Sequence, residues 1–350
     1  MAYTTINKSS LHMNTKLYTG NGSAGNAQTG VGFQPDLVWL KQRSGTEYHN
    51  LYDSLRGATK RLISNRTDNE NTISGLTAFG SDGFTVGSAD TANQNSQTFV
   101  AWNWKAGTTG SGTTTGSGTG KAYNYSVNTT AGFSIINYLG NGTAGHTIPH
   151  HLGVTPKMFI IKRYSAGSAG NDSWMVYHQE LDNTRRVILN SSSGEDADIS
   201  YWNNTSPNAT NFTVGTNNGG NNDGYSYICY CFRDVVGYSQ FGKYTGNGNA
   251  DGPFVYTGFK PAFVMTKRFN AGSSWDIHDT KRDTFNVATK YLLAEDTGAE
   301  GSTTVLDILS NGFKFRTSNQ DRNASGGLYI YMAFAEAPLV GTNGVTAKAR

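Results

Sequence analysis

Two tryptophans and two histidines have the types and spacing that could bind a ligand. Trp174 and Trp275 open the similar segments WMVYH and WDIHD, and His178 and His278 follow them. Tryptophan faces pack against the C–H faces of sugars, and polar side chains at the rim of such a site bind hydroxyls. One interpretation of these four residues is therefore a glycan-binding surface. The other places the tryptophans in a core, because Val176 would share a strand face with Trp174.

Three lysines recur at the ends of apolar runs, within VWLKQR, FIIKRY and VMTKRF. They are Lys41, Lys162 and Lys267. They could form a cationic patch that meets an acidic neighbour or a bacterial surface phosphate, or each could extend from a strand end into solvent. We favour the second interpretation, because duplication of one segment is enough to repeat its lysine.

The remaining reactive residue types do not form a recognisable catalytic or metal motif. Cys229 and Cys231 lie on one face of the predicted strand YICYCF, which suits buried packing better than a disulfide or half of a zinc site. His146, His150 and His151 in HTIPHHLG could bind a metal, but we favour a role in lining a turn. Carboxylates gather in turns, where glycosidase chemistry would need a separation that sequence does not give. We therefore predict no catalytic residue, no metal site and no cofactor.

The composition narrows the class of protein. Only 15% of the 350 residues are charged and the net charge is +3, which argues against nucleic-acid binding. No apolar run is long enough to predict membrane insertion. The opening MAYTTINKSS lacks the features of a secretory signal, so we expect synthesis in the cytoplasm without export by that route. Glycine at 43 residues, aromatic residues at 12% and only 7 prolines are typical of short strands joined by tight turns.

A repeat organises the chain. YTGNG at 18–22 returns as YLGNG at 138–142 and as YTGNG at 244–248, and the same series of apolar and aromatic segments follows each copy. The pattern predicts an all-β fold of three tandem antiparallel β-sandwich units, jelly-roll-like and of about six strands each. In the last strand of the first unit, Val100, Trp102 and Trp104 should face a core. The smaller residues between them should meet a closely packed neighbour or form a thin outer surface.

These segments set the predicted boundaries. The units are expected at 16–107, 132–236 and 237–338, with an N-terminal arm at 1–15 and a C-terminal tail at 339–350. Residues 108–131 are rich in glycine, serine and threonine, so they are expected to be a flexible linker that leaves the first unit freer than the other two. The two terminal segments are too short to fold alone and are expected to be disordered or to dock on a neighbour.

Several runs together resemble virion proteins of marine bacteriophages, including phages of cyanobacteria and of oceanic alphaproteobacteria. The runs are MAYTTI, NTKLYTGNG, GFQPDLVWLKQR, DSLRGATKRL, LTAFGSDGFTVGS and FVAWNWKAG. The likeness is closest in the first unit. The other two units resemble diverged copies, in which the segments that correspond to DSLRGATKRL are only weakly similar to it. The resemblance implies a structural protein of the particle and brings no catalytic residues with it.

We therefore expect a non-enzymatic virion protein on the particle surface, either a compact tail appendage or fibre adhesin, or a capsid decoration protein. A long fibre is disfavoured because the sequence has no coiled-coil heptads. Expected partners are other virion proteins, reached through the terminal arms, further copies of the same chain in a homo-oligomer, and a host surface glycan. The alternative is a lectin or depolymerase that acts on cell-surface glycans.

Overall fold

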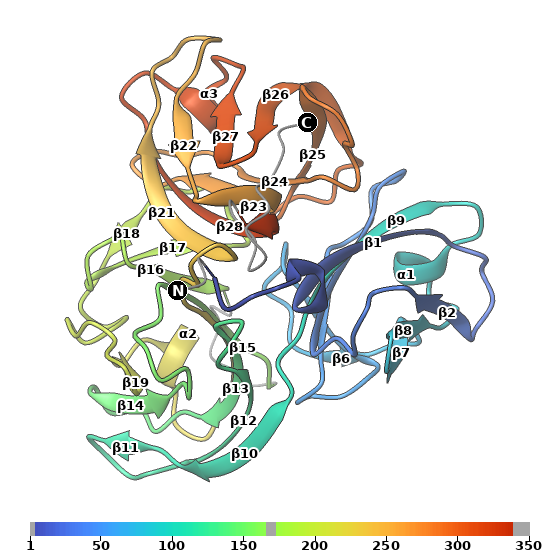
Figure 1. Ribbon diagram of the computed structural model, residues 1–350. Coiled ribbons are helices and arrows are strands. Elements are labelled where there is room, and N and C mark those ends of the chain that lie inside the picture. The colour runs from blue at the N-terminus through green and yellow to red at the C-terminus, as the bar shows by residue number, and fades with distance from the viewer. Residues whose placement is uncertain (1–3, 166–172, 339–350) are drawn as a thin grey trace.

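The computed structural model of the chain describes residues 4–165 and 173–338, and antiparallel strands dominate it. The helices in these residues are short: η1 (Ser9–Leu11), α1 (Asp90–Asn93), α2 (Asn218–Asn221) and α3 (Gln320–Asn323). No helix in this part of the chain is both long and apolar enough to cross a bilayer. Figure 1 shows three lobes around a common centre, which we call units 1, 2 and 3 in chain order. The predicted all-β fold is confirmed.

The inner sheets of the three units share one order of six strands, to which unit 2 adds β10 (Thr108–Thr113) and β12 (Ala122–Asn128) at one edge. Unit 1 has β1 (Met13–Thr19), β9 (Thr98–Trp104), β3 (Leu37–Gln42), β4 (Asn50–Asp53), β5 (Lys60–Ile63) and β6 (Asn71–Thr72). Unit 2 has β10, β12, β13 (Phe133–Leu139), β20 (Ser226–Phe232), β15 (Met158–Arg163), β16 (Met175–His178), β17 (Arg185–Ile188) and β18 (Asp196–Ala197). Unit 3 has β21 (Ser239–Thr245), β28 (Leu328–Pro338), β23 (Phe259–Arg268), β24 (Trp275–Asp279), β25 (Ala288–Leu293) and β26 (Gly301–Leu309).

A smaller outer layer closes each sandwich. It consists of β2 (Asn26–Thr29), β8 (Gly83–Val86) and β7 (Leu76–Gly80) in unit 1, and of β11 (Thr115–Gly116), β14 (His146–Pro149) and β19 (Asn211–Val214) in unit 2. In unit 3 the inner sheet continues through β26 into β27 (Gly312–Phe315) and β22 (Phe254–Tyr256). Each unit has its own buried hydrophobic cluster containing residues of both layers.

Both faces of each inner sheet are buried. On β9, Trp102 and Trp104 belong to a cluster shared by all three units, whereas Ala101 belongs to the core of unit 1 alone. Cys229 and Cys231 on β20 likewise face the core of unit 2. The small residues of these strands therefore lie against a closely packed sandwich interior. The large residues form a second core between the units.

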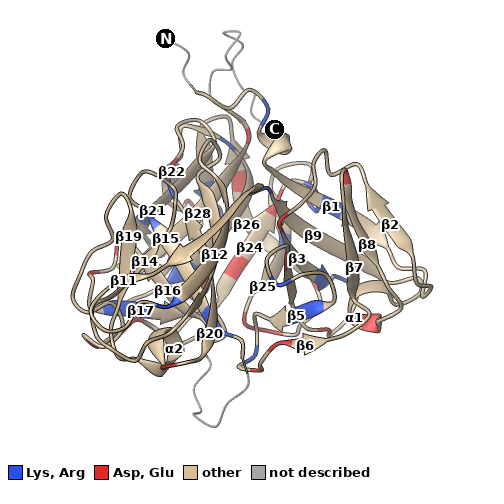
Figure 2. Cartoon of the chain, turned by 90° about the horizontal axis from the view of Figure 1, so that it is seen from below, with Lys and Arg blue, Asp and Glu red and all other residues tan. Residues whose placement is uncertain are grey.

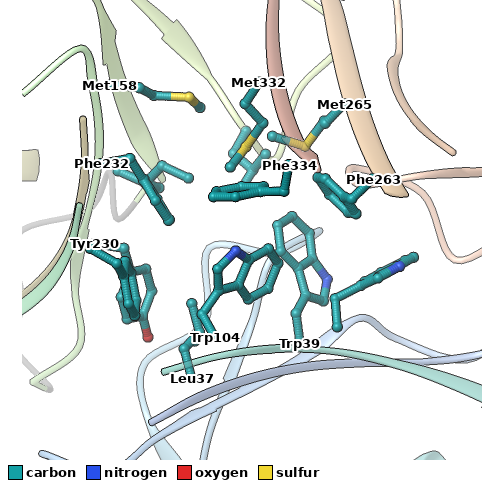
Figure 3. Close-up of a cluster of buried hydrophobic side chains, with 14 of the residues drawn as sticks. Leu37, Trp39, Trp104, Met158, Tyr230, Phe232, Phe263, Met265, Met332 and Phe334 are labelled. Atoms are coloured by element: carbon teal, nitrogen blue, oxygen red, sulfur yellow. The ribbon is translucent and has the colours of Figure 1, made fainter. Parts of the chain in front are cut away.

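The shared core lies where the three inner sheets meet. Figure 3 shows side chains from all three units pointing toward one another. Three of them, Trp104, Phe232 and Phe334, occupy the same position on β9, β20 and β28, and their ring centroids lie 6.5, 6.0 and 5.8 Å apart in edge-on contacts. Such contacts add about 0.5–1.5 kcal/mol each to the free energy gained from burial. The three rings form an approximate threefold centre within one chain.

The expected flexible linker is instead part of unit 2. Residues 108–113 and 122–128 form β10 and β12, which extend the inner sheet beyond β13, and β11 pairs with β14. The glycines have a packing role: a Cβ on Gly110 would lie 2.5 Å from the hydroxyl oxygen of Tyr125, and one on Gly112 would lie 2.8 Å from that of Tyr123. The linker prediction is therefore wrong, because cross-strand tyrosines cover the glycine-rich strand.

Unit 1 is also docked rather than free, because its tryptophans enter the shared core. The described part of the N-terminal arm packs on the same chain: Ile6 belongs to the shared core and η1 contacts β28. The predicted C-terminal tail, 339–350, lies outside the described residues.

The repeated YxGNG turn is held by a buried asparagine from the end of a short helix. In unit 1, Asn93 Oδ1 accepts from the backbone N–H of Asn21 (3.0 Å), and its carbonyl accepts from the N–H of Gly22 (2.8 Å), which has φ +70°. The Tyr18 hydroxyl donates to the Ala92 carbonyl at 2.6 Å. Equivalent bonds reach Asn221 and Asn323 in the other units. The motif recurs because each sandwich closes in the same way.

Gly20→Ala should destabilise the protein, because an added Cβ would lie 2.2 Å from the backbone carbonyl oxygen of Gln94. We expect a loss of about 2–3 kcal/mol in unfolding free energy, measured by denaturant titration. Gly272→Ala is the control: its Cβ would find its nearest neighbour at 3.5 Å. Equal stability of the two variants would contradict this account of the turn.

Candidate functional site

The two predicted ligand-binding tryptophans lie inside the protein. Trp174 and Trp275 are 0% and 1% exposed and belong to the shared core. Each indole N–H donates to a carbonyl of the preceding unit, Trp174 to Ile63 and Trp275 to Ile188, both at 2.9 Å. The core interpretation is confirmed, and a sugar-stacking surface at these residues is excluded because a ligand cannot reach them.

The two histidines do not join the tryptophans in one site. The fully buried His178 lies on the boundary with unit 3, where its Nε2 is 3.3 Å from the Tyr331 carbonyl and its Nδ1 accepts from the N–H of Glu180 at 3.2 Å. These partners require a neutral ring, and burial lowers its pKa to about 3. His278 is buried near Asp276, and burial with the neighbouring arginines holds its pKa well below 6.5. The expected polar rim of a sugar site is therefore absent at these positions.

The recurring lysines connect the units in a cycle. Lys41 Nζ donates to Thr297 of unit 3 at 3.1 Å and Lys162 Nζ to Thr67 of unit 1 at 2.8 Å. Lys267 Nζ donates to Ser192 of unit 2 at 3.0 Å.

All three lysines are 0% exposed, and burial lowers the pKa of Lys41 and of Lys267 to about 8. Both sequence interpretations are wrong, because neighbouring backbone carbonyls replace solvent around the ammonium groups.

The buried ion pairs were not predicted from the sequence, and two of them join an aspartate to the arginine three residues later. Asp53 pairs with Arg56 at 2.6 Å in unit 1, and Asp279 pairs with Arg282 in unit 3. Both side-chain pairs are at most 1% exposed. Both pairs could have been recognised in the sequence by the spacing D-x-x-R, which occurs in DSLR of unit 1 and DTKR of unit 3. At the equivalent position unit 2 has HQEL, which lacks both charged residues of the pair.

Each of these carboxylates also binds the adjacent unit. The Tyr230 hydroxyl of unit 2 donates to Asp53 at 2.8 Å, and the Trp102 indole of unit 1 donates to Asp279 at 3.0 Å. In unit 2 the equivalent residue, His178, approaches the carbonyl of Tyr331 in unit 3. Every boundary between units therefore has one buried polar contact of this kind.

The other candidate residues also have structural positions. His146 lies between Asn221 and Thr114, and the His150 Nε2 is 3.0 Å from the Asn208 carbonyl. Residues 4–165 and 173–338 contain no group of three potential metal ligands. Cys229 and Cys231 are buried free thiols with sulfurs 3.5 Å apart, as the packing interpretation predicted. The recurrent polar residues thus form a set of inter-unit connections, which we call the boundary network.

Asp279→Ala should lower the unfolding free energy by about 3 kcal/mol, because it removes a carboxylate that serves both a buried arginine and the Trp102 indole. Asp68→Ala is a matched control in an exposed ion pair with Arg66, where both side chains are 45% exposed. That change should cost at most about 0.5 kcal/mol. Denaturant titrations of both variants give the comparison, and similar losses would contradict a specific role for the buried pair.

His178 should make the protein sensitive to acid. Because its folded-state pKa is lowered to about 3, its stabilising contribution is complete above pH 6.5 and decreases as pH falls toward 3. Relative to His178→Asn, the wild type should lose about 1.4 kcal/mol of unfolding free energy per pH unit below 6.5. Unfolding measured at pH 8.5, 7.5, 6.5 and 5.5 tests this. The difference should be constant between pH 7.5 and 8.5, and constancy down to pH 5.5 would refute it.

Comparison with known proteins adds a family but no activity. No match was found among curated proteins. A family model described as Domain of unknown function (DUF7483) matches residues 8–338. The matched range includes all three units, and side chains from all three meet in the shared core. The chain therefore belongs to the DUF7483 family.

Proposed function

We propose that this chain is a non-enzymatic structural protein on the surface of a bacteriophage particle, either a compact tail appendage or a capsid decoration protein. The proposal begins from the resemblance of the first unit to marine phage virion proteins. The observation that supports it most is the boundary network. The lysine, aspartate and tryptophan side chains of this network, which could otherwise bind a ligand or take part in catalysis, are buried. They hold the three β-sandwiches together in one block.

The surface is consistent with such a block. Figure 2 shows charged residues of both signs scattered over a largely uncharged chain. Only 15% of the residues are charged and the net charge is +3, and many of the exposed positions are Asn, Ser, Thr or Gly. A surface of this kind favours contacts through shape and hydrogen bonds over long-range attraction to nucleic acid.

Other virion proteins, and further copies of this chain, are the proposed partners. The described N-terminal residues are already packed against their own chain, with Thr4 3% and Ile6 1% exposed. Contacts with neighbouring subunits would therefore involve mainly the outer layers of the sandwiches. The internal threefold centre already supplies within one chain the arrangement that a homotrimer would otherwise provide.

Purified particles of the encoding phage should contain the chain, and antibodies against it should label intact virions. Immunogold electron microscopy gives its position, and quantitative mass spectrometry gives its copy number. Tens to hundreds of copies per particle would indicate capsid decoration, and a few would indicate a tail appendage. Absence of the chain from purified virions would refute the proposal.

A further inference from the structure

The rim of the unit 2 inner sheet contains an open cleft of about 270 Å³. Its lining includes Ala122, Asn124, Asn137, Leu139, Tyr164 and Ser226. Every described residue that lines it is uncharged. The cleft exists because β12 extends this sheet beyond β13, an addition without a counterpart in the described parts of units 1 and 3.

Strand register places the polar side chains together. Asn124 of β12 lies opposite Asn137 of β13, and Leu139 lies opposite Ser226 of β20. Because strand residues alternate between faces, Asn137 shares its face with Ile135, which belongs to the shared core. This face is thus apolar near the centre of the molecule and becomes polar at the rim.

The two asparagines present hydrogen-bonding groups to the cleft. The Tyr164 hydroxyl donates to Asn137 Oδ1 at 2.9 Å, which fixes that amide and leaves its NH₂ group for a ligand. Within the described residues, the Asn124 side chain has no hydrogen-bond partner. An amide offers both donors and an acceptor, so two adjacent amides can bind neighbouring hydroxyls. Ala122, Leu139 and the Tyr164 ring provide apolar surface beside them.

At two of the corresponding positions in the other units, charged residues form ion pairs with a neighbouring unit. Lys243 of unit 3 takes the place of Asn137 and forms an ion pair with Glu180 of unit 2 at 3.0 Å. In unit 1, Arg43 takes the place of Tyr164 and pairs with Glu300 of unit 3 at 2.8 Å. These charged residues connect neighbouring units, whereas unit 2 has uncharged residues that leave the cleft open.

We propose that this cleft binds a neutral saccharide. Paired amides beside apolar and tyrosine surface match a sugar ring, with its adjacent hydroxyls and C–H face. The uncharged lining offers no cation to offset the carboxylate of an acidic sugar. This inference goes beyond the structural role proposed above, and a binding test on the purified chain is independent of whether the chain is found in virions.

Calorimetric titration of the full chain with neutral and acidic saccharides tests the proposal. The neutral probes are N,N′-diacetylchitobiose, lactose and maltose, and the acidic probes are glucuronate and sialyllactose. At least one neutral probe should bind, with a Kd on the order of 1 mM or tighter, and the acidic probes should bind at least tenfold more weakly. Asn124→Ala should weaken neutral binding about tenfold, the effect of losing one good hydrogen bond.

The controls separate loss of binding from loss of folding. Asn124→Ala should keep the wild-type melting temperature, because its side chain has no partner to lose within the described residues. Lys243→Ala changes the position in unit 3 that corresponds to Asn137 and should leave saccharide binding unchanged. The proposal is overturned if no neutral probe binds, if Asn124→Ala binds as well as the wild type, or if acidic probes bind equally well.

Discussion

Burial of the three inner sheets against one another is the interaction on which the rest of this structure depends. Trp104, Phe232 and Phe334 meet at its centre, each from the same strand position in its unit. A domain of about 100 residues buries only about 60–65% of the surface that its unfolded chain exposes. Here each unit has a second apolar face that only the other two units cover. The sandwich is therefore the repeated unit of sequence, and the trio is the stable unit of structure.

The boundary network gives this apolar contact a defined geometry. Hydrophobic burial is not directional, so it permits many rotations of one sheet against another. Buried lysines, indoles and carboxylates permit far fewer rotations. When such a group loses its hydrogen-bond partner and gains no water in its place, the protein loses about 1–3 kcal/mol or more of stability. Lys41, Lys162 and Lys267 each reach carbonyls of an adjacent unit, in one direction around the centre. Apolar burial supplies most of the free energy, and the network selects one arrangement.

Sequence reasoning predicted the strands, the repeat and the alternation of large and small residues, because these depend on local spacing. It did not predict the boundary network, because the partners are far apart in the chain. Trp174 is recognisable as a core residue, but its bond to Ile63 depends on another unit. Lys162 looks like a solvent-exposed strand end until Thr67 is placed beside it. The cleft in unit 2 depends on β12, which composition alone had assigned to a linker.

The three boundaries also constrain how the copies can diverge. Trp102 and Tyr230 donate to Asp279 and Asp53, but the third strand has Met332 at this position, which has no N–H or O–H to donate. Opposite it, the aspartate is replaced by His178, whose ring lies within hydrogen-bonding distance of the Tyr331 backbone carbonyl instead. Loss of a donor in one copy is thus matched by loss of an anion in its neighbour. Joining the copies in one chain permits this paired exchange, whereas a trimer of identical chains would have to make every change three times.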